Sequence, residues 1–357
     1  MMWPAILCTI GILAGFALVL RVPRCGDKSS DVLTEFSIII PARNEGKTLP
    51  HLLNSILRSS VRPAEIVLVD DGSTDNTATV ADSFGARVVP SAPLPDGWTG
   101  KTWACYQGAR LSKTDLLFFL DADVSFFADG LERIVAAWAH QGDKRTALSV
   151  LPYHDISAGY EQLSLIFNLL MAAGAGGFGA LSSQSLFGQS LLISRELYFE
   201  VDGHQSVKNA VLENLRLAPI LRAKRARIVS LAGAGTLRMR MFPEGFQQMT
   251  ESWSKAFVQG ARDSSRLIVF CSVLWISALW SCPFLLLINA GHSRAALTVV
   301  YLLLALQLYL TARQLGRYRL VTCLFYLVPL AYYCFVFGRS MVNRAAGRKA
   351  VWKGRNV

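Results

Sequence analysis

The sequence predicts an α/β domain with a mostly parallel sheet flanked by helices, plus transmembrane helices at the N-terminus and the C-terminus. Short β-rich apolar runs alternate with helical segments in the middle of the chain, and four long uncharged stretches lie towards its two ends. Of the 357 residues, 52% are hydrophobic and only 17% are charged. A soluble protein has about 25% charged residues, so this composition disfavours an ordinary soluble enzyme and a disordered chain.

The four uncharged stretches are each close to the length that crosses a hydrocarbon core of about 30 Å. They cover residues 1–20, 267–289, 295–312 and 320–338. Arg21 and Arg24 follow the first stretch, whereas a signal peptide carries its positive charge before the apolar run. By the positive-inside rule, the first stretch is predicted to be an anchor of a multi-pass cell-membrane protein whose middle part, residues 25–265, is cytoplasmic.

The C-terminal membrane region, residues 267–338, is predicted to hold two or three spans. Three full spans after a cytoplasmic domain would put the basic tail at 339–357 outside, against the charge rule. One of the later stretches is therefore expected to be re-entrant or interfacial. Pro283 and Pro329 are the candidate breaks, and the sequence does not choose between them.

The formal net charge of +11 has a local origin. Basic residues are concentrated in the segments 215–243, 313–319 and 339–357. Two of these segments flank apolar stretches, so contact with anionic lipid headgroups explains them better than nucleic-acid binding does. The seven cysteines form no CxxC pair and no zinc spacing, which indicates reduced packing residues.

Residues 33–262 are predicted to form the α/β domain. The expected strands are 36–41, 65–70, 86–90, 115–121 and 146–153, and the expected helices are 47–59, 74–84, 101–111 and 129–141. This alternation indicates βαβ units and a covered parallel sheet. Ligands of such sheets bind at the carboxyl ends of the strands, so the residues after each strand are the candidate site.

Polar residues follow three of the expected strands. Pro41-Ala42-Arg43-Asn44-Glu45 follows the first, Asp70-Asp71-Gly72-Ser73 the second and Asp121-Ala122-Asp123 the fourth. The second motif could equally be a helix N-cap when taken alone. The two carboxylates of the third can turn towards one divalent cation where the backbone leaves the strand, and hard oxygen ligands favour Mg²⁺ or Mn²⁺.

Two nucleotide-binding alternatives are disfavoured by the same residues. No GxGxxG follows the first strand, so a dinucleotide fold is not expected. Gly100-Lys101-Thr102 is similar to the end of a P-loop, but the first glycine of that motif would fall on Pro95. Proline has no N–H to offer a phosphate.

The strand-end motifs, together with Glu213-Asn214, resemble the family 2 glycosyltransferases with the GT-A fold. The segments 97–105, 253–257 and 352–355 are similar to a narrower group, the membrane-bound enzymes that glucosylate apocarotenoid acids, and to hopanoid-associated relatives. The resemblance covers nearly the whole chain. It implies a metal-dependent, inverting transfer of a sugar, first guess glucose, from a UDP-sugar to a lipid acceptor in the membrane, first guess an apocarotenoid acid.

The resemblance also implies a role for individual residues. Those that would bind the donor are Pro41, Arg43, Glu45, Asp71, Lys101 and Asp121. Asp121 and Asp123 would hold the metal, Mg²⁺ or Mn²⁺, on the diphosphate. Trp253 and Lys255 would lie on the acceptor side, although a plain amphipathic helix on the membrane accounts for them equally well.

Glu213 is the candidate general base. Members of the family usually have Glu-Asp where this chain has Glu213-Asn214, and an amide cannot accept a proton. A carboxylate acceptor hardly needs a base, so the departure is compatible with an apocarotenoid acid. Alternatives are a hopanoid, polyprenyl phosphate or glycerolipid acceptor, or a catalytically silent scaffold of the same fold. The Q(Q/R)xRW element of processive members is lacking, which favours a single transfer.

Overall fold

The computed structural model describes residues 3–19, 21–27, 35–175, 178–180, 185–263, 265–345, 351–352 and 355–356. Its internal contacts divide the chain into two compact units. The sheet unit consists of Pro23–Tyr153 and Gln184–Arg240, and the helical unit consists of Met1–Val22, His154–Ser183 and Met241–Val357. Two segments inside the predicted 33–262 domain, 154–183 and 241–262, thus group with the apolar helices.

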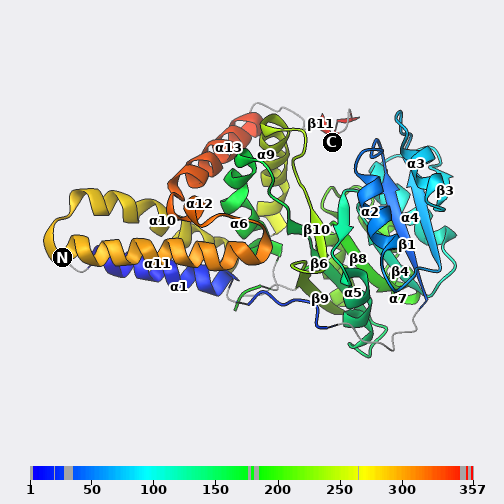
Figure 1. Ribbon diagram of the computed structural model, residues 1–357, viewed down its shortest axis with the longest axis horizontal. Helices are drawn as coiled ribbons and strands as arrows, with labels where there is room; N and C mark the ends of the chain where they lie inside the picture. Colours follow the sequence, from blue (N-terminus) through cyan, green and yellow to red (C-terminus); the bar gives the residue numbers. More distant parts are fainter. Residues whose placement is uncertain are drawn as a thin grey trace. The chain divides into compact units, whose positions relative to one another are not determined.

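The sheet unit is built on a seven-stranded sheet (Figure 1). Its strands, in spatial order, are β3 (Arg87–Pro90), β2 (Glu65–Asp70), β1 (Phe36–Ala42), β4 (Leu116–Leu120), β8 (Ser190–Ser194), β6 (Thr146–Leu151) and β9 (Arg227–Ala232). β1 pairs in parallel with β2 and β4, β2 with β3, and β6 with β9, while β8 runs antiparallel to β4 and β6. The predicted α/β class with a mostly parallel sheet is therefore confirmed.

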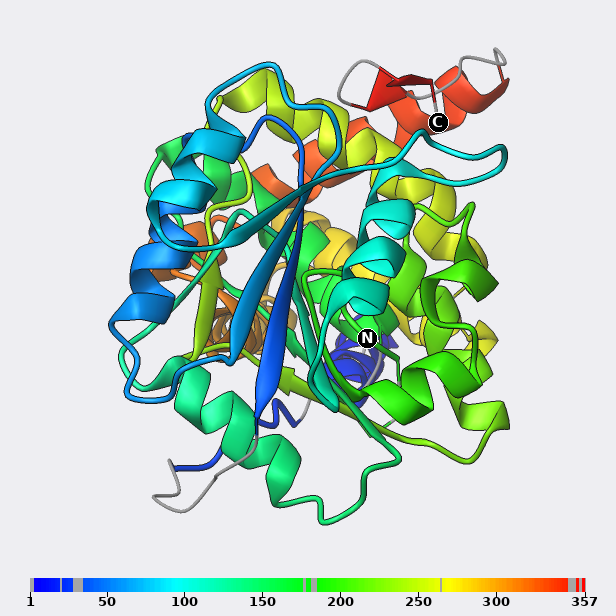
Figure 2. The same cartoon turned by 90° about the vertical axis from the view of Figure 1, so that its right-hand side faces the viewer.

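Helices cover both faces of this sheet. They are α2 (Leu49–Leu57), α3 (Thr77–Ser83), α4 (Gly100–Leu111), α5 (Gly130–Ala139), α7 (Arg195–Glu200), η2 (Gly203–Val207) and α8 (Glu213–Ala223). α2 and α3 lie on one side of β1 and α4 on the other (Figure 2). Because both faces are covered, the central strands are apolar along their whole length, and the five residues of β4 are all buried. A second sheet has the order β5 (Val124–Phe126), β10 (Leu237–Met239) and β7 (Tyr153–His154).

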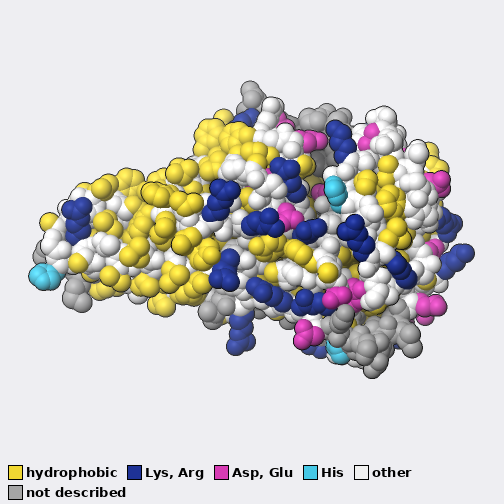
Figure 3. Space-filling model, in the orientation of Figure 1, with side chains coloured by type: hydrophobic (Ala, Val, Ile, Leu, Met, Phe, Trp, Pro, Cys, Tyr) yellow, Lys and Arg dark blue, Asp and Glu magenta, His cyan; other side chains and the backbone are white. Residues whose placement is uncertain are grey.

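The helical unit contains the apolar stretches. Its elements are α1 (Trp3–Val19), η1 (Gly159–Ser164), α6 (Leu165–Ala175), α9 (Phe246–Asp263), α10 (Arg266–Ile288), α11 (Gly291–Leu315), α12 (Leu320–Leu324) and α13 (Leu327–Ala345), with a short hairpin of β11 (Val351–Trp352) and β12 (Arg355–Asn356). Within the described residues, α10 and α11 are long and apolar enough to cross a membrane, and the apolar part of α1, Ile6–Val19, is shorter. Apolar side chains cover much of the surface of these helices (Figure 3).

The third C-terminal stretch is the broken one. α12 ends at Leu324 and α13 begins at Leu327, so Pro329 falls in the first turn of α13, where its missing N–H costs no helical hydrogen bond. α10 runs without interruption through Pro283. Of the two candidate breaks, the structure has the one beside Pro329.

Close backbone approach joins α1 to α10. Gly11 and Gly15 form a GxxxG pattern on α1, and a methyl group at Gly11 would overlap the Cβ of Ala278 on α10. Nearby, Gln307 of α11 donates from Nε2 to the carbonyl of Ile12 at 2.8 Å and accepts from Trp275 Nε1 at 3.0 Å. Small residues and buried hydrogen bonds are what hold apolar helices together when lipid surrounds them.

Gly11→Ala is expected to destabilise the helical unit by about 1–3 kcal/mol, because an added methyl group would force α1 away from α10. The measurement is thermal unfolding in detergent. Gly338→Ala is the matched control, since Gly338 is also helical but a methyl group there has open space. The control should be neutral or stabilising by up to about 1 kcal/mol. Equal melting temperatures for the two variants would contradict the close approach.

Candidate active site

The candidate site lies where the direction of strand addition in the main sheet reverses. β1, β2 and β3 follow one another towards one edge of the sheet, and the chain then returns to place β4 on the opposite side of β1. Crevices for ligands form outside the carboxyl ends of the strands at such a switch point. The motifs that begin with Pro41, Asp70 and Asp121 all stand at this edge, as the sequence predicts.

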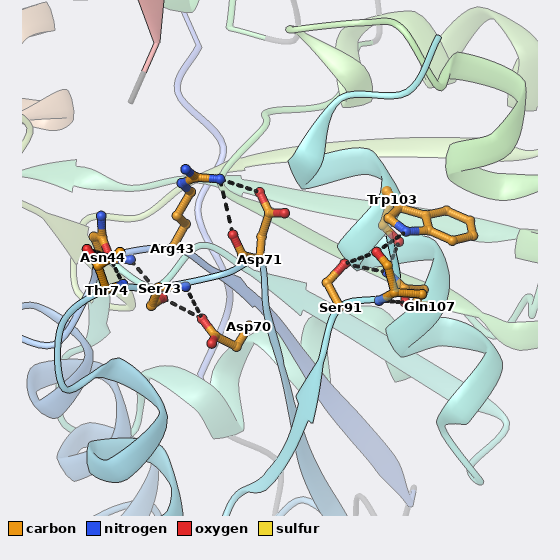
Figure 4. A network of polar contacts seen from close by, with 10 residues as sticks. Arg43, Asn44, Asp70, Asp71, Ser73, Thr74, Ser91, Trp103 and Gln107 are labelled. Carbon is orange, nitrogen blue, oxygen red and sulfur yellow. Dashed lines mark hydrogen bonds and ion pairs between the residues drawn. The ribbon is translucent and has the colours of Figure 1, made fainter. Parts of the chain in front are cut away.

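Polar contacts tie together the loops that follow β1 and β2 (Figure 4). Arg43 Nη1 donates to the carbonyl oxygen of Asp71 at 3.2 Å and lies 3.7 Å from its carboxylate. Asn44 Oδ1 accepts from the N–H of Thr74 at 2.8 Å, and the N–H of Asn44 donates to Ser73 Oγ at 3.0 Å. The Asp70 carboxylate accepts from the N–H and the hydroxyl of Ser73. The two loops therefore form one rigid rim that holds Arg43 beside Asp71.

Pro41 and Glu45 lie at the ends of the same rim. Pro41 is the penultimate residue of β1 and is partly exposed. The carboxylate of Glu45 accepts from Thr48 Oγ1 at 2.5 Å, and the backbone N–H of Glu45 donates to Thr77 Oγ1 at 2.8 Å. These contacts give Glu45 a part in shaping the loop before α2, and its donor-binding role stays a prediction.

Lys101 joins three parts of the sheet unit. It is the second residue of α4, whose N-cap Thr99 accepts from the N–H of Thr102. Its ammonium nitrogen lies 2.7 Å from Asp121 Oδ1 and 2.7 Å from Glu213 Oε1, and it donates to the carbonyl of Gly188 at 3.0 Å. Three predicted site residues, from the start of α4, the end of β4 and the start of α8, thus meet at one point.

The charges at this point perturb each other strongly. Burial raises the pKa of Glu213 above its usual range, and the adjacent ammonium opposes that rise. Burial by itself would lower the pKa of Lys101, but Asp121 and Glu213 outweigh it and hold the pKa of Lys101 above its ordinary value. Lys101 is therefore a permanent cation, held between two carboxylates at the switch point of the sheet. Strong perturbation of several groups in one place is typical of functional sites.

Asp123 follows Asp121 in the turn between β4 and β5. Both side chains are partly exposed, and 27% of the Asp121 side chain is accessible. Within the described parts of the chain, no group of three or more His, Cys, Asp or Glu side chains is arranged to hold a metal ion.

The structure gives Asn214 a role that an aspartate could not have. Asn214 is 3% exposed and donates from Nδ2 to the carbonyl of Phe187 at 2.9 Å. Lys101 holds the next residue, Gly188, through its carbonyl oxygen. Both side chains, together with Ser149, whose hydroxyl bonds to the backbone of Phe187, hold the loop that enters β8. An ionised aspartate at 214 would face a carbonyl oxygen with no proton to donate.

Asn214→Asp is expected to lower the unfolding free energy of the sheet unit by about 2 kcal/mol, because it places a buried carboxylate against the carbonyl oxygen of Phe187, which then keeps only the Ser149 hydroxyl as a donor. Denaturant unfolding measures this loss. The matched control is Asn54→Asp, since Asn54 also donates to a carbonyl, that of Pro50 at 2.8 Å, but is exposed. Equal losses of unfolding free energy in the two variants would mean that the contact between Asn214 and Phe187 does not stabilise the fold.

His204 is a structural residue of this unit rather than part of the charged group. It is 1% exposed, and its Nδ1 lies 2.9 Å from the hydroxyl of Tyr198. Burial, aided by the charge of Lys101, lowers the pKa of His204 to about 3. The imidazole is therefore neutral at physiological pH.

The low pKa of His204 predicts acid destabilisation. In the unfolded chain His204 binds its proton below about pH 6.5, whereas in the fold it does so only near pH 3. Stability should fall as the pH drops through this window, by up to about 1.4 kcal/mol per pH unit. Thermal melting from pH 7 to 5 should show a flatter dependence for His204→Gln than for the wild type. The exposed His51 gives the control, His51→Gln, whose slope should be that of the wild type.

The two predicted acceptor-side residues belong to the helical unit. Trp253 is 4% exposed, stacks on Phe167 with ring centroids 4.6 Å apart and donates to Ser164 Oγ at 3.2 Å. These contacts make Trp253 part of the packing between α9 and its neighbours. Lys255 lies on α9, but its side chain is outside the described residues.

The carbonyl groups of Phe187 and Gly188 are the part of the site that the sequence did not reveal. They lie in an uncharged segment, 162–194, whose described part contains α6 and β8. A backbone carbonyl has no side-chain signature, so only Gly188 itself hints at a close approach to Lys101.

A doubly wound sheet with charged loops at its switch point is the arrangement of an enzyme domain that binds its ligand at the carboxyl ends of its strands. The chain belongs to glycosyl transferase family 2, whose sequence profile matches residues 37–202. It is 34% identical over 330 residues to the 4,4'-diaponeurosporenoate glycosyltransferase of Staphylococcus aureus strain MRSA252, covering 89% of this chain and 87% of the relative. The protein of strain USA300 is 34% identical over 328 residues, with the same coverage.

A solved structure agrees with this assignment at the level of the fold. The mannosyltransferase PcManGT from Pyrobaculum calidifontis, in complex with GDP-Man and Mn²⁺, superposes with a TM-score of 0.54 at 15% identity. The similarity covers 96% of this chain and 99% of that one. The predicted GT-A-type fold is confirmed, and the chain is a glycosyltransferase.

Proposed function

We propose that the protein transfers a sugar, first choice glucose, from a UDP-sugar to a lipid acceptor in the membrane, with inversion at the anomeric carbon. The observation that carries this proposal is the meeting of Lys101, Asp121 and Glu213 at the switch point of the sheet. The name of the staphylococcal relatives supports an apocarotenoid acid as the first choice of acceptor.

The donor would lie along the rim after β1 and β2. Pro41, Arg43, Glu45 and Asp71 would line the uracil and ribose pocket, and Asp121 would hold the ribose. Lys101 already stands between two carboxylates, so a diphosphate that approaches it meets a cation that is positioned in advance. A preorganised charge of this kind stabilises a leaving group without having to reorient during the reaction.

The Asp121 and Asp123 carboxylates fit a divalent cation. They supply hard oxygen ligands, as Mg²⁺ and Mn²⁺ require, and their small number suits an ion that takes the rest of its ligands from substrate phosphates. When bound there, the cation would supply positive charge to the departing diphosphate. The solved mannosyltransferase carries Mn²⁺ together with its GDP-Man, which supports the same choice here.

Glu213 remains the candidate base, and its surroundings suggest a second role. Its raised pKa suits a proton acceptor, but its Oε1 already faces Lys101 at 2.7 Å. If the acceptor is an ionised carboxylate, no proton needs to be removed, and Glu213 would mainly hold Lys101 in position. Glu213→Gln keeps an oxygen for Lys101 and removes the base, so it separates the two roles.

The membrane setting belongs to the same proposal. The two apolar helices α10 and α11, with α1, would embed the protein in the cell membrane as a multi-pass protein with the sheet unit on the cytoplasmic side. An acceptor that lies in the bilayer would then reach an enzyme that is anchored beside it. A hopanoid, a polyprenyl phosphate or a glycerolipid are the alternative acceptors.

The test is release of the nucleoside diphosphate (UDP or GDP, according to the donor) by the purified protein, followed by mass spectrometry of the lipids. UDP-glucose, GDP-mannose and UDP-galactose are compared as donors, each with Mn²⁺, Mg²⁺ or EDTA. We expect release from UDP-glucose that depends on metal and on added apocarotenoid acid. Absence of release with every donor and lipid would favour the silent scaffold, and release that needs a different lipid would replace the acceptor.

A further inference from the structure

Two buried cysteines face each other between helices α1 and α10 of the helical unit. Cys8 lies on α1 and Cys282 on α10, both are free thiols in this structure, and both are completely buried. They are far apart in the chain, so no cysteine spacing in the sequence reveals them as a pair. The transfer chemistry proposed above uses neither thiol.

The register of the two helices places these thiols at the same level. A methyl group at Gly11 would overlap the side chain of Ala278, and a methyl group at Gly15 would overlap the ring of Trp275. A step forward along α1 is therefore a step backward along α10, which makes the two helices antiparallel. One turn before Gly11 and one turn after Ala278, the same register brings Cys8 opposite Cys282.

The helices also come close enough for a bond between the two side chains. Because Gly11 has no Cβ, the backbones of α1 and α10 approach each other at this level. The thiols of Cys8 and Cys282 form a hydrogen bond with each other, and the Cys282 thiol donates to the carbonyl of Leu297 at 3.7 Å. A disulfide joins Cβ atoms about 4 Å apart, a separation that suits residues one turn from a contact between glycine and alanine.

The proposed membrane setting puts this pair on the side away from the cytoplasm. Cys8 lies near the beginning of α1, and Cys282 lies near the end of α10. With the sheet unit on the cytoplasmic side, both of these helix ends belong to the outer half of the membrane. The cytoplasmic thiols that keep cysteines reduced do not act there, whereas disulfides persist at cell surfaces.

We propose that Cys8 and Cys282 form a disulfide that joins the N-terminal anchor to α10. One cysteine thiolate attacks a small disulfide on the outer side of the membrane and displaces one thiol, and the second cysteine thiolate then displaces the other. Two protein thiols and one small disulfide thus become one protein disulfide and two small thiols. The exchange takes place while the helix pair assembles, before α1 packs on α10 and buries both sulfur atoms.

A covalent bond at this point has a physical purpose. Apolar helices in lipid gain no hydrophobic free energy from touching each other, so their association depends on packing and on a few polar contacts. A disulfide between Cys8 and Cys282 would close a loop that contains most of the chain, and long loops gain the most from such a bond. The bond would keep α1 on α10 when the packing at Gly11 opens transiently.

The test is peptide mapping of the full-length protein. Thiols are alkylated in intact cells and again during unfolding, and no reductant is added before digestion. Trypsin cleaves after Arg21, Arg266 and Arg294, so the bond would link peptide 1–21 to peptide 267–294. We expect this linked pair, which dithiothreitol should separate. Alkylation of both Cys8 and Cys282 would overturn the proposal, and so would a link that forms only after treatment with copper–phenanthroline.

Peptide 267–294 contains a second cysteine that provides the matched control. Cys271 is half-buried on the same helix but about three turns away from Cys282. Cys271→Ser should keep the link, and Cys282→Ser should lose it. A link that survives in Cys282→Ser would mean that the pairing is wrong.

Thermal melting in detergent measures whether the bond holds the helices together. The unreduced wild type should melt about 5–10 °C above the same protein treated with dithiothreitol, and Cys8→Ala should show no such difference. Equal melting temperatures of the two wild-type samples would overturn the fastening role. Neither measurement uses a sugar donor, so failure here leaves the proposed function untouched, and Cys8→Ala should transfer sugar at the wild-type rate.

Discussion

Lys101→Met should lower the rate of sugar transfer by about 10²- to 10³-fold, the range seen when one preorganised group that stabilises developing charge is removed. Methionine keeps most of the length of the side chain but removes the cation between Asp121 and Glu213. The two carboxylates would then repel each other, and Glu213 would take up a proton more readily, because the ammonium would no longer oppose the burial and the Asp121 charge that raise the pKa of Glu213. The effect should appear mainly in kcat if Lys101 acts on the departing diphosphate.

The controls for Lys101 separate charge from packing. Lys101→Arg keeps the charge but cannot fit the same point between two oxygens, so it should recover only part of the activity. Lys113→Met changes an exposed lysine and should leave transfer unchanged. If Glu213→Gln loses less than tenfold while Lys101→Met loses more than a hundredfold, Glu213 positions the lysine. If the two lose equally and the pH profile of Glu213→Gln loses its acid limb, Glu213 is the base.

The strand-end motifs could be predicted because their signals are local. Apolar runs of five to seven residues end abruptly in polar residues, and parallel strands bring such ends to one edge of the sheet. In the structure Arg43 lies beside Asp71, and Asp121 lies beside Lys101. The meeting of Lys101 with Glu213, more than a hundred residues away, depends on where α8 returns to the sheet, and no local pattern encodes that return.

The antiparallel strand β8 was the hardest element to predict. It lies at the end of the uncharged stretch 162–194, which offers no charge pattern from which to predict the loop that carries Phe187 and Gly188. The role of Asn214 could not be predicted for the same reason. From the sequence, asparagine at 214 only weakens the argument that this position supplies a general base. In the structure, its amide donates to the carbonyl of Phe187 in the loop before β8.

The length of the apolar stretches could be predicted from the sequence, but the helices against which they pack could not. Absence of charge over about 20 residues is enough to expect a span, and α10 and α11 agree with that expectation. Trp253 could be interpreted from sequence as an acceptor contact because exposed and buried aromatic residues look alike in a helical pattern. Its stacking on Phe167 is a tertiary contact between helices far apart in the chain.

Asp123→Asn is expected to reduce transfer by about three powers of ten, equivalent to about 4 kcal/mol of transition-state stabilisation. Asparagine keeps the size and one oxygen but removes the charge that a divalent cation requires from a pair of carboxylates. The same variant should bind Mn²⁺ in the presence of UDP at least tenfold more weakly, which titration calorimetry measures. Asp82→Asn, an exposed change on α3, is the matched control and should alter neither property.

Asp121→Asn tests whether the two aspartates act alike. Asp121 already faces Lys101, and asparagine could still accept from that ammonium, so the ion pair would weaken rather than vanish. We therefore expect a smaller loss of Mn²⁺ affinity for Asp121→Asn than for Asp123→Asn, together with a higher KM for the UDP-sugar. Equal losses of Mn²⁺ affinity would mean that both carboxylates bind the cation directly and that Lys101 leaves Asp121 when the donor binds. Full activity of Asp123→Asn in EDTA would remove the metal from the mechanism and leave Lys101 as the group that stabilises the diphosphate.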